Sequence, residues 1–372
     1  MDVQVTRFRE VLGLLKPVVP RKTSLPILTN ILLKDGQAVA TDLETMVIVR
    51  LPEVDTPCLL PYADVVKMLQ FTRGGEYLHI EPKDGKVSLK WSEGSSSFVS
   101  KDVLDFPAVP EFVPVAEASL NSDVLIPALV SVLPYVSTAT DRAVLNGVTL
   151  VLGEPVEVAA GDGYRMAYQV MGLSFPQNIT TILPSSSVTA LNLLWEKTPR
   201  TPPRSDSLIP VVLAKKLVTV GFDGQTGLRF AFGDAATAIV KLIQGSPPAW
   251  LKLIPKEEPA FQTHVMATEL ELAVRRAAGL AKDGKGIIRM VFKDDTALIS
   301  ARKDEQEVES SVKTFASQGA PNKVGLSATY LLDYLKGKDG LVTICLGAEG
   351  APVLFQHQKN PRVLIMPMVV QW

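Results

Sequence analysis

The chain is poor in cysteine, histidine and unbalanced charge, and each shortage excludes a class of protein. Two cysteines among 372 residues, Cys58 and Cys345, are too few for a disulfide framework, so we expect a reducing, cytoplasmic location. Three scattered histidines offer no ligand set for a metal, and no apolar run reaches the roughly 18 residues of a membrane-spanning helix. A formal net charge of −1 excludes nucleic-acid binding by bulk charge alone. Any contact with DNA must come from basic residues gathered on one surface.

Sequence signatures of catalysis are also missing, which predicts a protein that is not an enzyme and has no cofactor. The chain has no GxSxG, HExxH, P-loop or CxxC motif. Gly161-Asp162-Gly163 is interpreted as a tight turn, since Asp42 occupies the matching place in an earlier repeat. The enzyme alternative would need a carboxylate pair around Asp42 and Asp162, and the sequence supplies no matching histidine or cysteine.

A pattern of one amphipathic helix followed by three strands occurs six times. Apolar residues at helical spacing predict helices that begin near residues 5, 62, 121, 185, 268 and 327. One helix with a three-stranded meander cannot bury both of its faces, whereas two such units form a domain of about 120 residues with a real core. We therefore predict an α+β fold of three similar domains, each made of two helix-plus-meander units. The predicted domains are 1–118, 119–253 with a surface insertion near 198–210, and 254–372.

Charge is unevenly distributed between the expected helices and the rest of the chain. Six helix-bearing windows carry a net charge of +6 and the remaining residues carry −7; the windows are 5–16, 62–73, 121–140, 185–204, 267–285 and 327–338. Because equivalent helices of a repeat array face one side, this sorting predicts a positive helical face suited to DNA phosphates. The alternative interpretation is that lysine and arginine merely keep the helix surfaces solvated.

Five motifs occur in order along the chain. They are TSLPILTNILL (23–33), TDRAVLNGVTL (140–150), AAGDGYRMA (159–167), the connector Pro248–Pro255 and VLIMPM (363–368). With these motifs and the three-domain repeat, the chain resembles the bacterial DNA polymerase III beta subunit family of replicative sliding clamps over essentially its whole length. The resemblance implies the DNA clamp fold and a head-to-tail homodimer that closes into a ring.

The resemblance implies a function without covalent chemistry. Members of the family encircle double-stranded DNA without sequence specificity and tether the replicative polymerase, so that its dissociation becomes intramolecular rebinding. The implied partners are a second copy of the chain, double-stranded DNA, the replicative DNA polymerase, the clamp loader and other proteins with a clamp-binding motif. ATP is used by the separate loader, which agrees with the absence of a nucleotide motif here.

In the family, a hydrophobic cleft between the second and third domains binds short linear peptides of these partners. Leucine, methionine and proline side chains would give such a cleft adaptable apolar walls. The matching motifs place these residues in the cleft: Leu145, Gly161, Gly163, Tyr164, Arg165, Met166, Pro248, Lys252, Leu253, Ser327, Tyr330, Leu364, Ile365, Met366, Pro367 and Met368.

For DNA contact, Lys22 matches a basic residue that precedes a Thr-Leu-Pro segment in the family. The other DNA-binding candidates come from the helix windows: Arg7, Arg73, Lys197, Arg200, Arg276, Lys282 and Lys336. For the ring, the family mode places strand 95–100 and helix 62–73 of one subunit against helix 268–281 and strand 306–315 of the other. The interface candidates are Lys67, Phe98, Lys101, Leu270, Val274, Glu305 and Glu307.

Two features depart from the family pattern. Members usually have Thr-Asp-Gly-His-Arg-Leu where this chain has Gly161-Asp162-Gly163-Tyr164-Arg165-Met166, and the chain continues past the usual end to Gln371 and Trp372. The shape and peptide preference of the cleft are therefore left open. The alternative function is a repeat-built, peptide-binding adaptor with no DNA role, which would share the cleft but would need no positive helical face.

Overall fold

The computed structural model describes the chain except for residues 140, 199–215, 256, 282–285, 321, 359–360 and 371–372. From residue 199 on, the insertion predicted near 198–210 lies outside the described residues, as do Arg200, Lys282, Gln371 and Trp372. In the part of the chain that is described, no helix is long and apolar enough to cross a membrane.

The chain folds into two compact units that alternate along the sequence. Unit 1 consists of Met1–Val130, Val151–Val156 and Met171–Gln244. Unit 2 consists of Ser131–Leu150, Glu157–Val170 and Gly245–Trp372. The three-domain division of the sequence stays a prediction.

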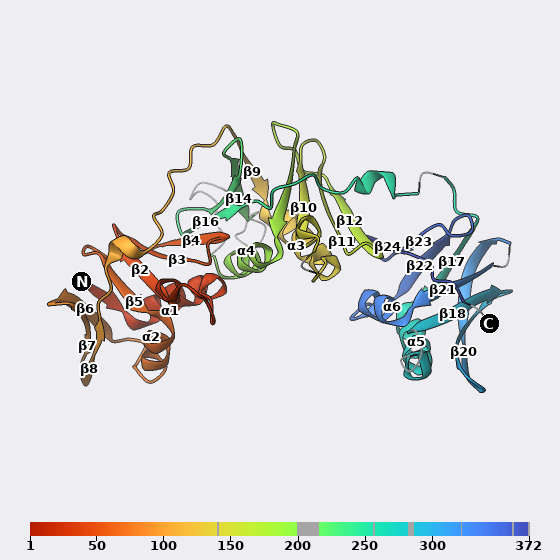
Figure 1. Cartoon of the computed structure of the whole chain (residues 1–372), viewed down its shortest axis with the longest axis horizontal. Coiled ribbons are helices and arrows are strands. Elements are labelled where there is room, and N and C mark those ends of the chain that lie inside the picture. Colours follow the sequence, from red (N-terminus) through yellow and green to blue (C-terminus); the bar gives the residue numbers. More distant parts are fainter. Residues whose placement is uncertain are drawn as a thin grey trace, which may run out of the picture. The chain divides into compact units, whose positions relative to one another are not determined.

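Each predicted repeat contains an α-helix, which confirms the periodicity (Figure 1). In α1, the predicted core positions Val5, Phe8, Leu12 and Leu15 are at most 2% exposed. In unit 1, α1 packs against α2, and in unit 2, α5 packs against α6. Among the described residues the helices are α1 (Val5–Leu15), α2 (Tyr62–Leu69), α3 (Ser122–Val132), α4 (Ser185–Lys197), α5 (Ala267–Ala281) and α6 (Ala328–Leu335).

The three strands expected after each helix are present as well. In chain order they are β2 (Asn30–Lys34), β3 (Gln37–Thr41), β4 (Thr45–Arg50), β6 (Tyr77–Lys83), β7 (Lys86–Trp91), β8 (Gly94–Val99), β10 (Gly147–Leu152), β11 (Val156–Gly161), β12 (Arg165–Met171), β14 (Leu217–Phe222), β15 (Gly227–Phe232), β16 (Ala236–Lys241), β18 (Ile287–Lys293), β19 (Thr296–Lys303), β20 (Gln306–Gly319), β22 (Leu341–Leu346), β23 (Val353–Gln356) and β24 (Arg362–Ile365).

One further strand, which the sequence analysis missed, precedes every helix. These strands are β1 (Asp2–Gln4), β5 (Cys58–Pro61), β9 (Ala116–Asn121), β13 (Ile179–Pro184), β17 (Phe261–Met266) and β21 (Asn322–Ser327). Each passes directly into its helix, so no turn residues mark where the strand ends. Pro61 and Pro184, at two of these junctions, are residues that ordinarily indicate a loop.

The extra strand of one repeat pairs with the first meander strand of the neighbouring repeat. In unit 1, β1 pairs with β6, β5 with β2, and β9 with β14, all antiparallel. In unit 2, β17 pairs with β22 and β21 with β18. Because the backbone groups of each extra strand find their partners in the other repeat, neither repeat of a pair is complete alone.

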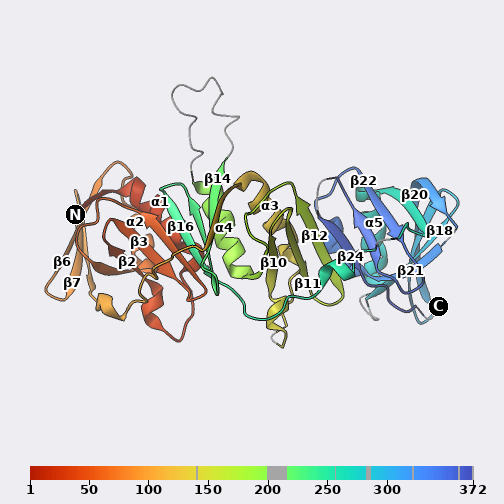
Figure 2. The ribbon, with the colours of Figure 1, turned by 90° about the horizontal axis from the view of Figure 1, so that it is seen from above.

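The third meander strands join repeats that are far apart in the sequence. In unit 1, β4 pairs antiparallel with β16, over Thr45–Val49 and Ala236–Val240. In unit 2, β12 pairs antiparallel with β24, over Arg165–Tyr168 and Arg362–Ile365, and the two strands run side by side in Figure 2. Unit 1 therefore joins the first repeat to the fourth, and unit 2 joins the third to the sixth.

The interpretation of Gly161-Asp162-Gly163 as a turn is confirmed. Oδ1 of Asp162 accepts hydrogen bonds from the N–H groups of Tyr164 (2.9 Å) and Arg165 (3.0 Å), between β11 and β12. Asp42 and Asp223 make the same pair of bonds in the β3–β4 and β14–β15 turns. The residue after each aspartate has a positive φ: Leu43, Gly163 and Gly224. Both carboxylates of the enzyme alternative therefore accept backbone hydrogen bonds in their own hairpins.

The segment 112–115 crosses the β14–β15 hairpin, and we call it the strap. A Cβ on Gly227 would lie 3.3 Å from the Phe112 ring, and a Cβ on Gly221 would lie 3.4 Å from the same ring. On the ring, the guanidinium carbon of Arg229 lies 5.2 Å from the centroid. The two glycines thus leave the space that the strap occupies on unit 1.

Replacing Phe112 by alanine should lower the free energy of unfolding of unit 1 by about 1–2 kcal/mol, because the half-buried ring leaves a hollow above two glycines. Urea or thermal unfolding measures the change. Phe71, which is 91% exposed, provides the matched control, and Phe71→Ala should stay within about 0.5 kcal/mol of the wild type. Equal effects of the two substitutions would show that the strap is not docked.

Candidate functional site

An apolar cluster covers one face of the joined strands β11, β12 and β24 in unit 2. Its centre consists of four residues that are each at most 8% exposed: Ala159, Met166, Tyr168 and Leu364. Three partly exposed residues pack against this centre: Trp250, Ile254 and Leu354. Met166 and Leu364 are direct cross-strand partners, so the pairing of β12 with β24 places them side by side.

Trp250 is held on the apolar cluster by a hydrogen bond and by a missing side chain. Its indole Nε1 donates to Oγ1 of Thr149, in β10, at 3.0 Å. A Cβ on Gly161 would lie 2.9 and 3.0 Å from two carbon atoms of the indole. Since Cβ atoms do not approach other atoms so closely, any side chain at position 161 would displace the ring or the strand. Gly161 therefore leaves the space that the indole occupies.

Exposed apolar side chains lie around the cluster. Tyr164 is 59% exposed, Leu253 50% and Met366 41%, and we call these three residues the rim. The N–H of Met366 donates to the carbonyl oxygen of Tyr164 at 2.8 Å, which holds the end of β24 beside the β11–β12 turn. The N–H of Leu253 donates to the carbonyl oxygen of Trp250 at 2.9 Å. Large exposed apolar side chains next to an apolar cluster are typical of a surface that binds a partner.

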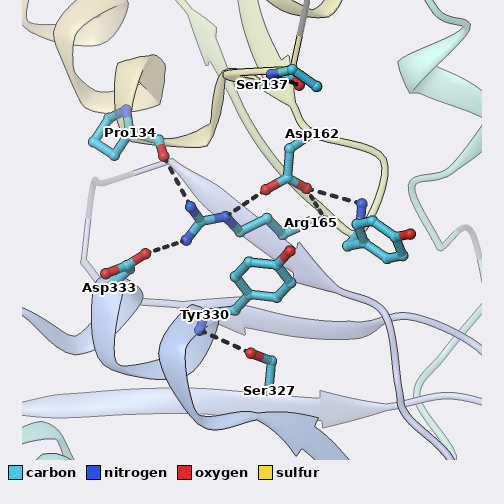
Figure 3. Close-up of polar contacts among 9 residues, drawn as sticks. Pro134, Ser137, Asp162, Arg165, Ser327, Tyr330 and Asp333 are labelled. Carbon is cyan, nitrogen blue, oxygen red and sulfur yellow. Dashed lines mark hydrogen bonds and ion pairs between the residues drawn. The ribbon is translucent and has the colours of Figure 1, made fainter. Parts of the chain in front are cut away.

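Arg165, at the start of β12, is the centre of a polar network (Figure 3). Its Nε donates to Oδ2 of Asp162 at 3.0 Å, and its Nη1 donates to Oδ2 of Asp333, in α6, at 2.7 Å. The remaining nitrogen, Nη2, donates to the carbonyl oxygen of Pro134 at 3.2 Å. One side chain thus connects the β11–β12 turn, α6 and the segment that follows α3.

Two tyrosine rings complete the surroundings of Arg165. Its guanidinium carbon lies 4.5 Å from the ring centroid of Tyr330 and 5.3 Å from that of Tyr135. Burial acts to lower the pKa of Arg165, but hydrogen bonds with Asp333 and Asp162 outweigh it, and the pKa is raised. Burial also raises the pKa of Tyr135 to about 12 and raises that of Tyr330. The guanidinium stays charged, and only 11% of the side chain is exposed.

The predicted cleft residues all belong to unit 2 and differ in exposure. Contacts among them include Tyr164 with Met366, Arg165 with Tyr330, Arg165 with Ile365, Met166 with Leu364 and Ser327 with Tyr330. Five are buried: Leu145, Gly161, Met166, Leu364 and Ile365. Six are half-buried: Arg165, Pro248, Ser327, Tyr330, Pro367 and Met368. Five are exposed: Gly163, Tyr164, Lys252, Leu253 and Met366. Their role in binding stays a prediction.

Three residues that build this site were missed in the sequence. Trp250 is the aromatic residue of the connector Pro248–Pro255, and a large aromatic side chain within a cleft motif could have indicated it. Tyr135 lies in the 3-10 turn after α3, where an aromatic residue indicates only local packing. Asp333 has a side chain that is 47% exposed on a helix surface, where carboxylates are ordinarily solvated, so only its proximity to Arg165 reveals a role.

The observed helices carry less positive charge than the wider windows that contain them. Within the observed bounds α1 has a net charge of +1, α2, α4 and α5 have zero, and α3 and α6 have −1. The positive helical face, which the wider windows predict, therefore stays a prediction. Among the described residues, Lys16 follows α1 directly and Lys336 follows α6 directly, at ends where the helix dipole favours cations.

The described DNA-binding candidates differ in how free their side chains are. Arg7 donates to the carbonyl oxygen of Arg50 at 3.0 Å and lies 3.5 Å from the Glu10 carboxylate. Arg73 forms an exposed ion pair with Glu93 at 3.6 Å. The other described candidates are exposed: Lys22, Lys197, Arg276 and Lys336. Nζ of Lys197 lies 2.9 Å from the place of a Cβ on Gly13, so the end of α4 lies against α1.

Two of the interface candidates are inside the chain's own core. Leu270 and Val274 are 0% exposed, on α5, which packs against β18, β19 and β20. Their helical spacing marked the core of unit 2, so the expectation that they dominate contact with a second chain was wrong. Phe98 is half-buried, and the charged candidates are exposed: Lys67, Lys101, Glu305 and Glu307.

The described residues offer no metal centre and no activated thiol. No group of three or more His, Cys, Asp or Glu side chains is placed there to hold a metal ion. Burial raises the pKa of the Cys58 thiol to about 12 and raises that of Cys345 as well. Both thiols therefore stay protonated at neutral pH, the form that is a poor nucleophile.

Comparison with known proteins points to one family. Residues 251–369 match the family model described as DNA polymerase III beta subunit, C-terminal domain. The beta sliding clamp of Vibrio cholerae is 26% identical over 365 residues, which cover 94% of this chain and 93% of the relative. The beta sliding clamp of Pseudomonas aeruginosa is 25% identical over 382 residues, which cover 96% of this chain and 97% of the relative.

Solved structures share the fold over the whole chain. The DNA polymerase III subunit beta of Pseudomonas aeruginosa superposes with a TM-score of 0.86 at 21% identity and covers 100% of both chains. The beta subunit of Thermotoga maritima gives a TM-score of 0.85 at 16% identity and covers 99% of both chains. The predicted α+β clamp fold is thereby confirmed.

Replacing Arg165 by lysine should destabilise unit 2 by about 1–3 kcal/mol, because a compact ammonium group lacks the planar fork that reaches three separate acceptors and stacks on two rings. Urea unfolding measures the loss. Arg142→Lys is the control, since the side chain of Arg142 is 61% exposed and lies 3.9 Å from Asp141. That control should change stability by less than about 0.5 kcal/mol. A similar small change for Arg165→Lys would contradict the network's contribution.

Proposed function

Because the chain is a member of the DNA polymerase III beta subunit family, we propose that it is a non-catalytic sliding clamp that encircles double-stranded DNA and tethers a DNA polymerase. Similarity over more than nine-tenths of the chain to curated beta sliding clamps supports this function, as does the clamp fold. Its place of action is the cytoplasm. The function needs a site for partner peptides, an interface that closes a ring and basic residues that face DNA.

The peptide site that we propose is the apolar cluster with its rim. The observation that carries it is the exposure of Tyr164, Leu253 and Met366 beside a buried apolar centre. Two anchor side chains that bury about 100–150 Å² each would contribute about 5 kcal/mol before entropy losses. The occupants are short peptides of the replicative polymerase, the clamp loader and other proteins with a clamp-binding motif.

The ring interface follows from the strand pairing within the chain. Among the third meander strands, β4 pairs with β16 and β12 with β24, which leaves β8 and β20. In the described part of the chain, β8 is the edge of the sheet β1-β6-β7-β8, and residues 306–313 of β20 pair only with β19. Within the chain, the third meander strand of one repeat pairs with the third meander strand of another repeat. Pairing of β8 in one copy with β20 in another extends this rule between chains. Two such contacts close a head-to-tail ring.

Side chains along the two edges are complementary. Glu305 and Glu307 are exposed beside β20, and Lys67 and Lys101 are exposed in the part that contains β8. Exposed ion pairs contribute only about 0–1 kcal/mol each. Apolar contact must therefore supply most of the affinity, and Val99, which is 78% exposed at the end of β8, is available for it.

Light scattering at micromolar protein in about 0.15 M salt should give a mass twice the 40.3 kDa of the chain. Val99→Asp should weaken dimerisation about tenfold or more, because it places a charge in the apolar contact. Val113→Asp is the matched control, since Val113 is 67% exposed in the strap, away from β8. A monomeric wild type, or equal effects of the two variants, would count against this interface.

Contact with DNA is proposed through basic side chains on or near the helices. Long, exposed lysine and arginine side chains there bind phosphates, which carry no sequence information. Each phosphate neutralised releases counterions, so such contacts make retention on DNA depend on salt. The candidates with described positions are Arg7, Lys22, Arg73, Lys197, Arg276 and Lys336.

Replacing Arg7, Lys22 and Lys197 together by alanine should weaken retention on closed circular DNA and reduce the salt dependence by roughly one unit of slope per lost contact. The control removes three exposed strand lysines instead: Lys34, Lys241 and Lys293. Retention is measured by gel filtration of loaded DNA across a salt series. A loss as large in the control would show that only net charge matters.

The adaptor alternative is distinguished by the same assay. A peptide-binding adaptor would bind partner peptides at the apolar cluster but would not be retained on closed circular DNA. A wild-type ring with a preference for one base sequence would also contradict contact through phosphates alone. The family relationship favours the clamp.

A further inference from the structure

The indole of Trp250 fills part of the proposed peptide site from within the chain. It packs against the apolar cluster, whose centre includes Met166 and Leu364. It also occupies the space that a side chain at Gly161 would need. These three residues are among those predicted to contact a bound peptide, and all three are buried. A peptide that reaches this site therefore meets the indole before it meets the residues beneath.

The indole is fixed in this place. The bond from its Nε1 to Thr149 ends on a hydroxyl that is part of a residue only 2% exposed. Leaving that buried acceptor without a donor has a cost, which opposes rotation of the ring out of the site. The backbone of Trp250 is held as well, through its bonds with Pro248 (2.8 Å) and Leu253 (2.9 Å). A peptide consequently has to adapt to the ring.

We propose that Trp250 is a specificity-determining residue of the peptide site, and that it selects peptides with an aliphatic anchor of leucine size over peptides with an aromatic anchor. This proposal rests on the proposed function. A leucine side chain can pack on the partly exposed indole, next to the rim residue Leu253. An aromatic ring would have to enter the peptide site more deeply than leucine, and the indole already occupies that part of the site. Pockets distinguish side chains of such different volume by roughly 10- to 200-fold.

Calorimetric titration with two synthetic peptides tests the proposal. Both have the sequence of a polymerase tail, and the apolar anchor is leucine in one and phenylalanine in the other. The wild type should bind the leucine peptide about tenfold more tightly. In Trp250→Ala the ratio of the two affinities, leucine peptide over phenylalanine peptide, should fall to about one or below one. The reason is that the space of the indole becomes available to phenylalanine. Trp250→Phe should give an intermediate ratio.

Trp91→Ala is the matched control, since Trp91 is half-buried in β7 of unit 1 and has no part in the site. Its ratio should equal that of the wild type. An unchanged ratio in both Trp250 variants overturns the proposal even if both bind less tightly, because a purely structural residue weakens both peptides alike. If Trp250→Ala melts below the assay temperature, Trp250→Phe alone decides in the same way. A folded wild type that binds neither peptide overturns the proposed peptide site itself.

Discussion

The antiparallel pairing of β12 with β24 is the interaction on which the candidate site depends. It joins two segments nearly 200 positions apart in the sequence, Arg165–Tyr168 and Arg362–Ile365, by backbone pairing and by a hydrogen bond from Arg362 to the hydroxyl of Tyr168. The pairing brings Met166 beside Leu364 and so creates the centre of the apolar cluster. It also fixes where β24 ends, and with it the exposed Met366. A shift in register by one residue would move the apolar side chains to the other face and remove the site.

Arg165 reinforces this pairing from the first residue of β12. Taking a guanidinium out of water costs several kcal/mol unless its donors and its charge are matched. Here carboxylates of Asp162 and Asp333 supply the charge, the Pro134 carbonyl accepts the third bond, and two tyrosine rings cover the faces. The match makes Arg165 a structural connector between α6 and the β11–β12 turn. Lys252, which precedes the rim residue Leu253, is exposed and is not part of this network.

The sequence predicted what repeats locally and missed what depends on distant contacts. Helix periodicity and Asp-Gly turns were sufficient for the six helices, the meander strands and the Asp162 turn. The strands before the helices were missed because their partners lie in another repeat, so local propensity contained no sign of them. Leu270 and Val274 were assigned to an interface because a buried helix face has the same pattern whether it packs on its own chain or on a partner. Trp250 was missed because its position depends on Gly161, nearly 90 residues earlier.

The pairing rule also explains why the chain would need a second copy. Each repeat ends in a third strand with one edge to satisfy, and four of the six are satisfied within units 1 and 2. An exposed strand edge invites indiscriminate pairing unless it is short, polar or charged. β8 has the sequence GSSSFV, and β20 begins with Gln306, Glu307, Val308 and Glu309, so both remaining edges carry polar or charged residues. Edges of this kind discourage aggregation and still allow pairing with one complementary strand. Pairing of β8 with β20 of another copy would satisfy both of these edges and close a ring, which is the arrangement that encircling DNA requires.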